Sequence, residues 1–392
     1  MTPSLGALLR ELDEVMADGV ALRRELHAQP ELGGQEHETC ATLEAALAPL
    51  EVRRFAPTGL MVRLGSPDVP AVVVRAELDG LPVAERTGAG FASTTGKMHA
   101  CGHDVHMASL VCLVRALSRL LDGDDVPIVA LFQPSEEISP SGAKMLLDQA
   151  RDVGPARAVG AAHVHPEIPF GQVAAPPGAI NASSDEIEIR VRGAATHGAY
   201  PHRGRDPVLA LSAIIVALQH VVSRQIDPVR PAVVSIGRFL ADGGHNVIPE
   251  EAVALGTLRA VSERERASLR AAVDSVVKHV AAAHGCAAVL TVEDGEPVLE
   301  NDAGLAAQFG EALPETGLAL AEPFTSCGSD DFAYYSPWGP LLMQFVGVAG
   351  AQVLGDVPLH DPRFLPADAA VRAVAASAAT FFVAATDAHA RQ

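Results

Sequence analysis

The sequence predicts an α/β fold in which a mostly parallel sheet carries helices on both faces, with a second domain inserted into it. Short β-branched segments alternate with helical segments in the first part of the chain, as in a parallel sheet covered by helices. The middle part contains a complete β-α-β-β-α-β series, which is the ferredoxin-like pattern. The length of 392 residues also exceeds that of one ordinary core.

The first part of the chain is built from buried strands and one-sided helices. The run AVVVR is short and β-branched, which is typical of a strand buried on both faces. In residues 104–121 the apolar side chains recur at helical spacing and fall on one face. The expected elements are helices over 5–27 and 104–121 and strands over 71–75, 126–132, 158–162 and 341–348.

The middle part has a different pattern. Residues 186–192 (EIEIRVR) alternate charged and apolar side chains, as in a half-exposed strand. Ser262 followed by Glu265 forms a capping box, which predicts the start of a helix. The expected elements are strands over 186–192, 232–238, 252–259 and 287–293 and helices over 207–222 and 262–284. We therefore expect a catalytic domain in two pieces, 1–180 and 294–392, around an inserted lid domain at 181–293.

Composition argues against several kinds of partner. The net charge of −19 argues against nucleic acid and against an anionic membrane surface. Five widely spaced cysteines, an odd number, argue against a disulfide framework and favour a reducing cytoplasm. The N-terminus lacks the basic and apolar pattern of a signal peptide. We expect no membrane span, because the apolar run 209–222 is interrupted by polar side chains. A cytoplasmic protein that acts on small molecules fits these observations.

The densest group of metal-binding side chains lies in Met98–His106 (MHACGHDVH). It holds three histidines, one cysteine and one aspartate within nine residues. Thiolate and imidazole are ligands that Zn, Mn, Ni or Co accept, and this mixture does not distinguish between these metals. The segment therefore indicates a metal site, provided that further ligands come from elsewhere in the chain.

Further acids and histidines directly follow predicted strands. They are Glu77 and Asp79 after AVVVR, Glu136 and Glu137 after VPIVALF, His163 and His165 after AVGAA, and His360 after LLMQFVGV. The carboxyl ends of strands form the ligand-binding edge of an open α/β sheet. Taken singly, adjacent glutamates are typical of a solvated loop and histidines of a surface. Their joint placement favours a metal site with two ions, at which one glutamate is a ligand and its neighbour a general base.

Several motifs in this order resemble those of a known family. They are LHAQPELGGQEHET, RAELDGLPV, MHACGHDVHM, QPSEE, HVHP, THGAYPH, NVIPE with GTLR, GSDDFAYY and LHDP. They are similar to motifs of the metal-dependent amidohydrolases of the aminoacylase and carboxypeptidase clan. The branch is that of the hippurate hydrolases, indole-acetyl-amino-acid hydrolases and N-acyl-diaminopimelate deacetylases. The resemblance covers nearly the whole chain, and it implies a zinc-peptidase-like sheet with an inserted lid.

The resemblance also implies the metal ligands. They are Cys101, His103, Glu137, His163 and His360. Cys101 stands where related enzymes use a bridging aspartate, so we expect it to bridge two divalent ions. His103 and His163 would share one ion, and Glu137 and His360 the other.

The same resemblance assigns roles to residues around the ligands. Glu136 is the implied general base, and Asp79 matches an aspartate that orients the site from behind the ligands. His165 and His106 are expected to be supporting or incidental. Glu77 stands where the family often has aspartate, and its role is left open.

The inserted domain offers candidates of its own. His197 lies in the turn THGAYPH, and the resemblance makes it a donor to the oxyanion of the tetrahedral intermediate when the lid closes. The alternative is that THGAYPH is a Gly/Pro turn that contains histidines without a catalytic role. Asn246 and Arg259, on the same domain, are expected to bind a substrate carboxylate.

The function implied by the resemblance is hydrolysis of the amide bond of N-acyl amino acids by a metal-activated water with Glu136 as base. The same centre could serve a dipeptidase or carboxypeptidase, since only the pocket would differ. A non-catalytic binding homologue is the other alternative, against which the complete ligand set argues. The metal, the acyl group and the amino acid are not determined by the sequence, and a homodimer through the lid is expected by analogy.

Overall fold

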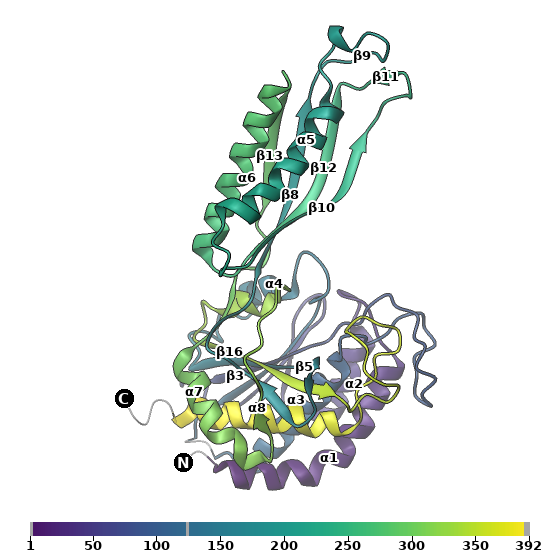
Figure 1. The fold of residues 1–392 in the computed structure, drawn as a ribbon. Coiled ribbons are helices and arrows are strands. Elements are labelled where there is room, and N and C mark those ends of the chain that lie inside the picture. The colour runs from purple at the N-terminus through teal and green to yellow at the C-terminus, as the bar shows by residue number, and fades with distance from the viewer. Residues whose placement is uncertain (1–2, 123–124, 388–392) are drawn as a thin grey trace. The chain divides into compact units, whose positions relative to one another are not determined.

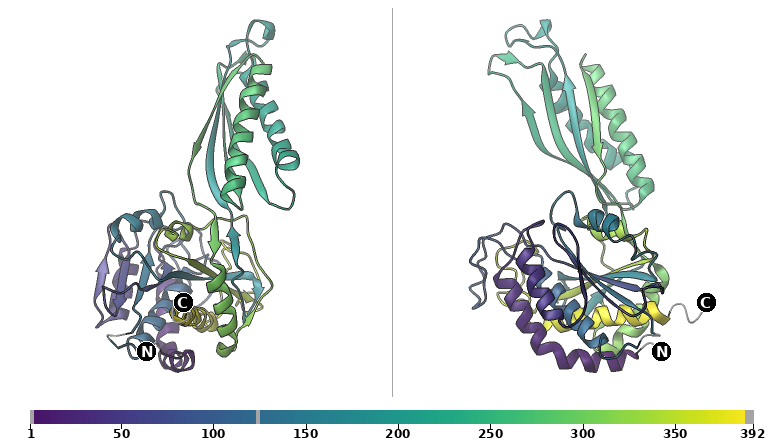
Figure 2. Two further views of the ribbon diagram at one scale, coloured as in Figure 1. Left: turned by 90° about the vertical axis from the view of Figure 1, so that its left-hand side faces the viewer. Right: turned by 180° about the vertical axis from the view of Figure 1, so that it is seen from behind.

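The computed structural model describes residues 3–122 and 125–387, and it divides into two compact units (Figures 1 and 2). The first unit contains the chain up to Gly178, Glu300–Phe324 and the part from Asp331 onwards. The second unit contains Ala179–Leu299 and the short segment Thr325–Asp330. The chain crosses between the units within β7 (Gly178–Asn181), within β14 (Leu299–Asn301) and at each end of Thr325–Asp330.

An eight-stranded, mostly parallel sheet forms the centre of the first unit. Its strands are β1 (Val52–Arg54), β2 (Leu60–Leu64), β3 (Val72–Glu77), β4 (Ile128–Gln133), β5 (Ala158–Pro169), β6 (Gln172–Ala174), β15 (Ala319–Leu320) and β16 (Leu341–Ala349). They are ordered β1-β2-β4-β3-β5-β16-β6-β15, and the four middle strands run parallel, as predicted. Every residue of β3 and β4 is buried, which explains why their sequences are apolar runs without alternation.

The register of β3 creates an opening in the sheet at its carboxyl edge. β3 pairs with β4 along its whole length, from Val72 to Glu77. Its ladder with β5 ends earlier, at the pair Arg75 and Ala161, while β5 continues beside β16. The last two residues of β3 therefore separate from β5 at the edge where ligands are expected.

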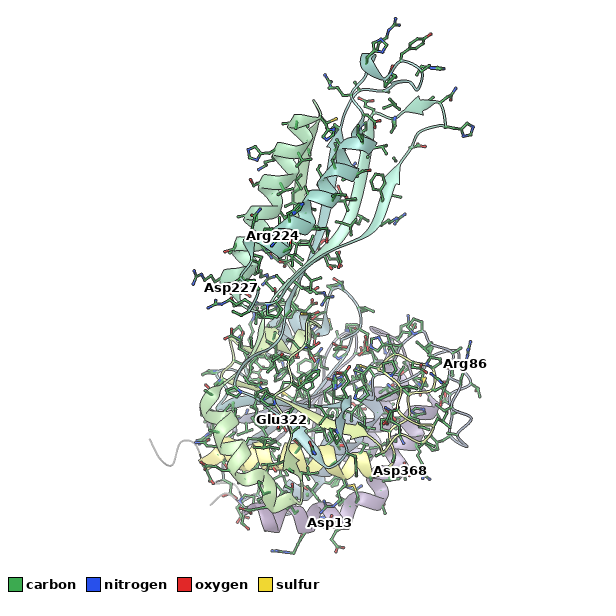
Figure 3. All side chains as sticks on the ribbon, viewed as in Figure 1. Asp13, Arg86, Arg224, Asp227, Glu322 and Asp368 are labelled. Atoms are coloured by element: carbon green, nitrogen blue, oxygen red, sulfur yellow. The ribbon has the colours of Figure 1, made fainter. Side chains whose placement is uncertain are left out.

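Helices cover both faces of this sheet (Figure 1). Their bounds are α1 (Leu5–Ala28), α2 (His37–Leu47), α3 (His103–Leu117), α4 (Gly142–Gln149), α7 (Ala303–Ala312) and α8 (Ala369–Asp387), with short helices η3 (Leu313–Thr316) and η4 (Asp331–Tyr335). Helices α3 and α8 pack against the sheet and α1 packs across both of them. The Ser4 side chain caps α1 by accepting a hydrogen bond from the Ala7 N–H. The Asp13 side chain of α1, labelled in Figure 3, accepts a hydrogen bond of 2.7 Å from Nε of Arg372 in α8.

The second unit has the ferredoxin-like pattern that the sequence predicted. Its elements are β8 (Ser183–Arg192), β9 (Thr196–His197), η1 (Pro201–Arg203), α5 (Pro207–His220), η2 (Val221–Gln225), β10 (Ala232–Ala241), β11 (Val247–Ile248), β12 (Glu251–Ala260), α6 (Glu263–Ala283) and β13 (Ala287–Glu293). Four of the strands form an antiparallel sheet in the order β10-β12-β8-β13, and α5 and α6 cover one face of it (Figure 2). Ser262 caps α6 and accepts a hydrogen bond from the Glu265 N–H, so the predicted capping box is confirmed.

The predicted elements are confirmed, with differences at their ends. The helix expected over 104–121 ends at Leu117, and the strand expected over 158–162 continues to Pro169. Helices α2, α4, α7 and α8 were not predicted. In α8 nearly every side chain is buried, so its sequence lacks the polar face that gives an amphipathic helix its periodicity.

Two helices in the described part of the chain are long and apolar enough to cross a membrane by length and composition. They are Pro207–Gln225, which includes α5, and α8. This differs from the expectation that no segment could span a membrane. The few polar residues within 209–222 lower its mean hydropathy too little to exclude it. Most of α8 is buried inside the first unit, as a core helix is.

Candidate metal centre

Four separate segments bring the five predicted ligands to the carboxyl edge of the first unit's sheet. Cys101 and His103 lie at the start of α3, on either side of Gly102. Gly102 has a φ of 87°, and a Cβ atom there would lie 2.4 Å from Val164 of β5, so this close approach requires glycine. The other ligands are Glu137 from the loop after β4, His163 from β5 and His360 from the segment after β16.

The five predicted ligands form one continuous group. Ligand atoms of Cys101, His103 and Glu137 lie within 4.8 Å of one another. Sγ of Cys101 is 3.5 Å from Nε2 of His163. Nε2 of His360 is 3.4 Å from Oε1 of Glu137. Cys101 therefore lies close to the imidazoles of both His103 and His163, and Glu137 connects this group to His360.

The unsatisfied atoms in this group fit a bound cation. His103 Nε2 and Glu137 Oε1 are buried and have no hydrogen-bond partner among residues 3–122 and 125–387. Such an atom costs about 1–3 kcal/mol when it is left unpaired. The combination of thiolate, imidazole and carboxylate donors suits a divalent transition metal, and such an ion would satisfy both atoms.

Burial sets the protonation of the ligands. It raises the pKa of the Cys101 thiol well above its usual range. It would by itself lower the pKa of His103, but the neighbouring Asp79 and Cys101 reverse the effect and hold that pKa well above its usual value. Burial, with the neighbouring His106, lowers the pKa of His163 well below its usual value. A metal ligand must be deprotonated, so an ion that binds here displaces protons from Cys101 and His103.

Asp79 orients two of the ligands. Its main-chain carbonyl oxygen is 2.8 Å from Nδ1 of His103, while its carboxylate Oδ1 is 3.6 Å from the same atom. Its other carboxylate oxygen accepts a hydrogen bond of 3.0 Å from the N–H of Glu137. The His103 ring is therefore directed by the backbone of Asp79, and the Asp79 side chain holds the loop that carries the glutamates.

The loop that carries Glu136 and Glu137 is held in a constrained conformation. Ser135 has a φ of 55°, and its N–H donates a 2.8 Å hydrogen bond to the buried carboxylate of Glu36. His360, at the other side of the group, has a φ of 66°. Left-handed backbone in residues other than glycine is costly and gathers at functional sites. Glu36 was not recognised from the sequence; the only signal is its position in the motif LHAQPELGGQEHET.

Glu136 lies next to the proposed ligands. Its carboxylate Oε2 is 4.0 Å from Nε2 of His103, and its side chain is 16% exposed. The carboxylate is thus reachable from solvent and close to the atom at which a cation would bind. A carboxylate in this position is chemically able to accept a proton from a group bound beside His103.

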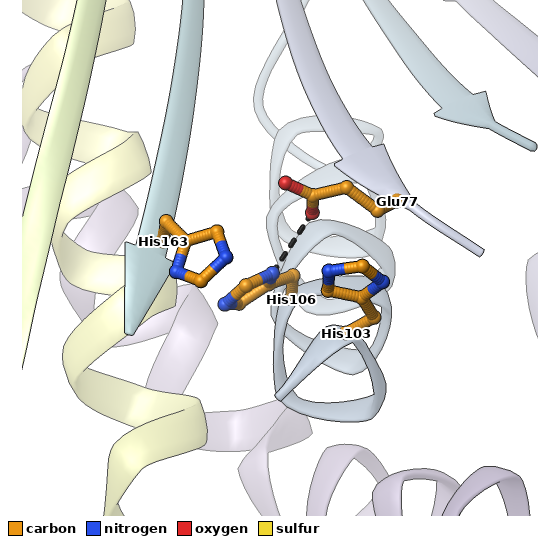
Figure 4. Close-up of side chains that lie close together, drawn as sticks. All are labelled: Glu77, His103, His106 and His163. Carbon is orange, nitrogen blue, oxygen red and sulfur yellow. Dashed lines mark hydrogen bonds and ion pairs between the residues drawn. The ribbon is translucent and has the colours of Figure 1, made fainter. Parts of the chain in front are cut away.

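A second cluster shares two of the ligands and extends to where β3 separates from β5 (Figure 4). It contains Glu77, His103, His106 and His163, all of them buried, with ligand-type atoms within 4.8 Å of one another. Burial would raise the pKa of Glu77, but Arg75 and His106 outweigh it and lower this pKa well below the usual value. Glu77 is therefore an ionised carboxylate in the interior. His165 lies apart from this cluster, with its ring centroid 4.2 Å from that of Phe324.

The three candidates of the second unit do not all lie together. His197 pairs with Val247 in the small β9–β11 ribbon, and the Asn246 carbonyl accepts a hydrogen bond from the Gly198 N–H. Arg259 lies near the far end of β12, roughly 25 Å along the strand from this ribbon. One copy of the second unit therefore cannot bring Asn246 and Arg259 to the same substrate carboxylate.

The fold and the site define a class. A set of thiolate, imidazole and carboxylate donors at the carboxyl edge of a mostly parallel sheet, largely buried except for the exposed His360, fits an α/β metal-dependent hydrolase. The chain belongs to the peptidase family M20/M25/M40, whose family model matches residues 73–381.

Relatives agree with this assignment. An N-acetyl-L-cysteine deacetylase of Bacillus subtilis (strain 168) is 33% identical over 350 residues, which cover 88% of this chain and 82% of that protein. An N-acyl-L-amino acid amidohydrolase of Geobacillus stearothermophilus is 36% identical over 301 residues, or 75% and 81% of the two chains. The solved structure of the Bacillus subtilis YXEP protein, described as a dinuclear metal binding peptidase from the M20 family, matches with a TM-score of 0.82. It is 29% identical and covers 96% of this chain and 99% of that one. The chain is therefore a hydrolytic enzyme of the kind that cleaves amide bonds.

Proposed function

We propose that the protein hydrolyses the amide bond of N-acyl amino acids and releases a carboxylic acid and a free amino acid. The observation that carries this proposal is the position of Glu136, whose carboxylate is 4.0 Å from the buried and unpaired Nε2 of His103. The two curated relatives support the substrate class, because their names specify N-acyl or N-acetyl amino acids.

The proposed metal centre uses all five predicted ligands. His103 and His163 would hold one divalent ion and Glu137 and His360 the other, with Cys101 between them. The contacts of Cys101 with His163 and of Glu137 with His360 support this division. When bound, the two ions would lower the pKa of a water and polarise the amide carbonyl. The donor set is compatible with Zn, Mn, Ni or Co.

The protein's own groups would move the proton and fix the geometry. Glu136 takes a proton from the attacking water and returns it to the departing nitrogen, so a single carboxylate serves as base and then as acid. Asp79 keeps the Nε2 atom of His103 directed at the centre, since its carbonyl engages Nδ1. The Asp79 carboxylate holds the Glu137 backbone, which keeps the Glu136 side chain beside the ligands.

The second unit would complete the site. We assign His197 as a donor to the oxyanion of the tetrahedral intermediate, and Asn246 and Arg259 as binders of the substrate carboxylate. Because Asn246 and Arg259 are far apart in one copy, binding of one carboxylate by both residues requires that they come from different copies of the chain. A homodimer through the second unit is supported by exposed apolar side chains on α5 and on the edge strand β10. They are Leu209, Val216, Phe239 and Leu240.

A substrate panel tests this function. The metal-free protein is supplied with Mn or Zn and given N-acetyl, N-benzoyl and indole-acetyl amino acids, and release of the free amino acid is measured. We expect hydrolysis of at least one N-acyl amino acid that depends on the added metal. Cleavage of dipeptides without cleavage of N-acyl amino acids would favour the peptidase alternative, and no bound metal after repletion would favour a binding protein.

We also propose a cytoplasmic location, to be checked by fractionation of the source cells.

A further inference from the structure

The second cluster contains a buried histidine whose two ring nitrogens are both occupied. Nδ1 of His106 is 2.8 Å from Oε2 of Glu77 (Figure 4). Nε2 of His106 lies 2.9 Å from the backbone nitrogen of Val164. A backbone N–H can only donate, so Nε2 must be the acceptor and Nδ1 must carry the proton. His106 therefore has no lone pair left for a metal, although its neighbours are metal-binding residue types.

The His106 ring occupies the opening left by the strands. The ladder between β3 and β5 ends at Arg75 and Ala161, two residues before Glu77 and three before Val164. Glu77 closes β3 and Val164 continues β5, and the His106 ring connects them by one hydrogen bond on each side. The Val164 N–H lies beyond the end of the β3–β5 ladder and has no partner on β3. The His106 ring accepts its hydrogen bond instead.

The connection continues to a proposed metal ligand. The carbonyl of Val164 is 2.7 Å from Nδ1 of His163 and accepts its proton. The same bond leaves Nε2 of His163 to face Sγ of Cys101, at 3.5 Å. The two imidazole rings lie with their centroids 4.5 Å apart. The N–H of Val164 is thus anchored by His106, while its carbonyl directs the His163 ring.

Glu77, at the opposite end of the series Glu77–His106–Val164–His163, is held in place by ion pairs. Glu77 forms a buried ion pair with Arg75, and Arg75 in turn contacts the Asp331 carboxylate at 2.6 Å. The Arg75 side chain also donates to Oε1 of Gln133 at 2.9 Å. Glu77 therefore cannot rotate away from His106 without breaking a buried ion pair, which is a costly change.

We propose that His106 and Glu77 are positioning residues for the metal ligand His163, acting through the Val164 peptide. The inference rests on the proposed metal centre and deepens it. It assigns a role to Glu77, which the sequence left open, and to His106, which lies in the Cys-Gly-His-Asp-Val-His segment without binding a metal.

Metal titration of the whole protein tests the role of the pair. The metal-free wild type, His106→Ala and His106→Gln are titrated with Zn against a chromogenic chelator. We expect His106→Ala to weaken one of two binding steps by about 10–100-fold and to leave the other unchanged. His106→Gln should restore most of the affinity, because its amide can accept from Val164 and donate to Glu77. The matched control is His165→Gln, a histidine of the same strand as His163 that should keep wild-type affinity.

Ring-nitrogen NMR of the metal-free protein separates positioning from a general loss of packing. In the wild type we expect His106 and His163 both to carry their proton on Nδ1. In His106→Ala we expect His163 to become a mixture of tautomers while the fold is retained. Wild-type affinity at both steps in His106→Ala, or an unchanged His163 tautomer, would overturn the proposal. The NMR measurement needs neither hydrolysis nor bound metal. A protein that binds no metal would refute the proposed function, while the tautomer of His163 in His106→Ala would still decide whether His106 positions this ring.

Discussion

The carboxylate of Asp79 accepts a hydrogen bond of 3.0 Å from the backbone N–H of Glu137. This contact joins the loop after β3 to the loop after β4, 58 residues further along the chain. It fixes the backbone at the second of two adjacent glutamates. The chain bends at these two residues and their side chains lie beside different histidines, Glu137 beside His360 and Glu136 beside His103. Two chemically identical residues can thereby have different roles.

Replacing the central thiol should weaken metal binding and leave the fold intact. In Cys101→Ser the hydroxyl does not ionise near neutral pH, so it is a much poorer ligand than a thiolate. We expect metal affinity to fall by at least about 10-fold with a small change in Tm, because serine keeps the shape of the side chain and the contact of Sγ with His163 is long, at 3.5 Å. Metal titration and thermal denaturation measure the two effects. Cys327→Ser, at an exposed cysteine, is the control, and equal affinity in the two variants would contradict the assignment.

The role of His197 can be separated from metal binding. If it donates to the oxyanion, His197→Ala should lower kcat by about 100- to 1000-fold without changing metal content. Steady-state kinetics and metal analysis of the same preparation measure this. The control is His202→Ala, which removes an exposed histidine from the same turn. A kcat equal to that of the wild type would remove His197 from the site.

A buried charge network should make stability depend on pH. His27 lies between two carboxylates, with Nδ1 at 2.9 Å from Asp104 and Nε2 at 3.2 Å from Glu85. Burial alone would lower the pKa of His27, but Asp104 and Glu85 outweigh it and raise this pKa to about 9. Because the folded-state pKa is higher than the unfolded value of about 6.5, the stabilisation is complete below about pH 6.5 and is lost as the pH rises through about 9.

We expect the free energy of unfolding to fall by about 3 kcal/mol between about pH 6 and about pH 10 on account of this group. Urea denaturation across this range measures the change. His27→Gln should be less stable at the lower pH and should show a much smaller dependence. The same slope in both proteins would show that other groups cause it.

One glycine in the sheet tests the packing of the core. A Cβ atom on Gly160 of β5 would lie 2.3 Å from Cε1 of Phe381 in α8, and Phe381 is fully buried. We expect Gly160→Ala to lower the free energy of unfolding by about 1–3 kcal/mol, because a packed ring has to move. Gly90→Ala, where a Cβ atom would meet nothing within 4 Å, is the control. Equal melting temperatures for the two variants would contradict the packing of α8 on β5.

The ligand positions were predictable because they follow a topological rule. Glu77 ends strand β3 and Asp79 follows it, and both acids come directly after the apolar run AVVVR; the same pattern of an apolar run followed by polar side chains locates Glu137 and His163. Parallel strands bring their carboxyl ends to one edge, so residues distant in sequence come together once the strands are known. The sequence could place these side chains at one edge, and the resemblance supplied their individual roles.

The contacts around the ligands were not predictable in the same way. The His106 ring fills the opening where β3 and β5 separate, and no periodicity in the sequence records where a ladder ends. The network of His27 and Asp104 depends on Arg23 as well, whose Nε donates to Asp104 at 2.7 Å across 81 positions of the chain. Such contacts are set by tertiary packing. Helix α8 was missed for a related reason, since a helix buried on all sides has no polar face.

The central claim is that Glu136 is the base of a metal-dependent amidohydrolase, and the variant Glu136→Gln tests it most directly. Hydrolysis of the best N-acyl amino acid from the panel is compared with that of the wild type, and the metal content of both proteins is measured. We expect kcat to fall by about 100- to 10,000-fold with the metal content unchanged, because the amide cannot accept the proton. Hydrolysis at the wild-type rate by a metal-loaded Glu136→Gln protein would contradict the account.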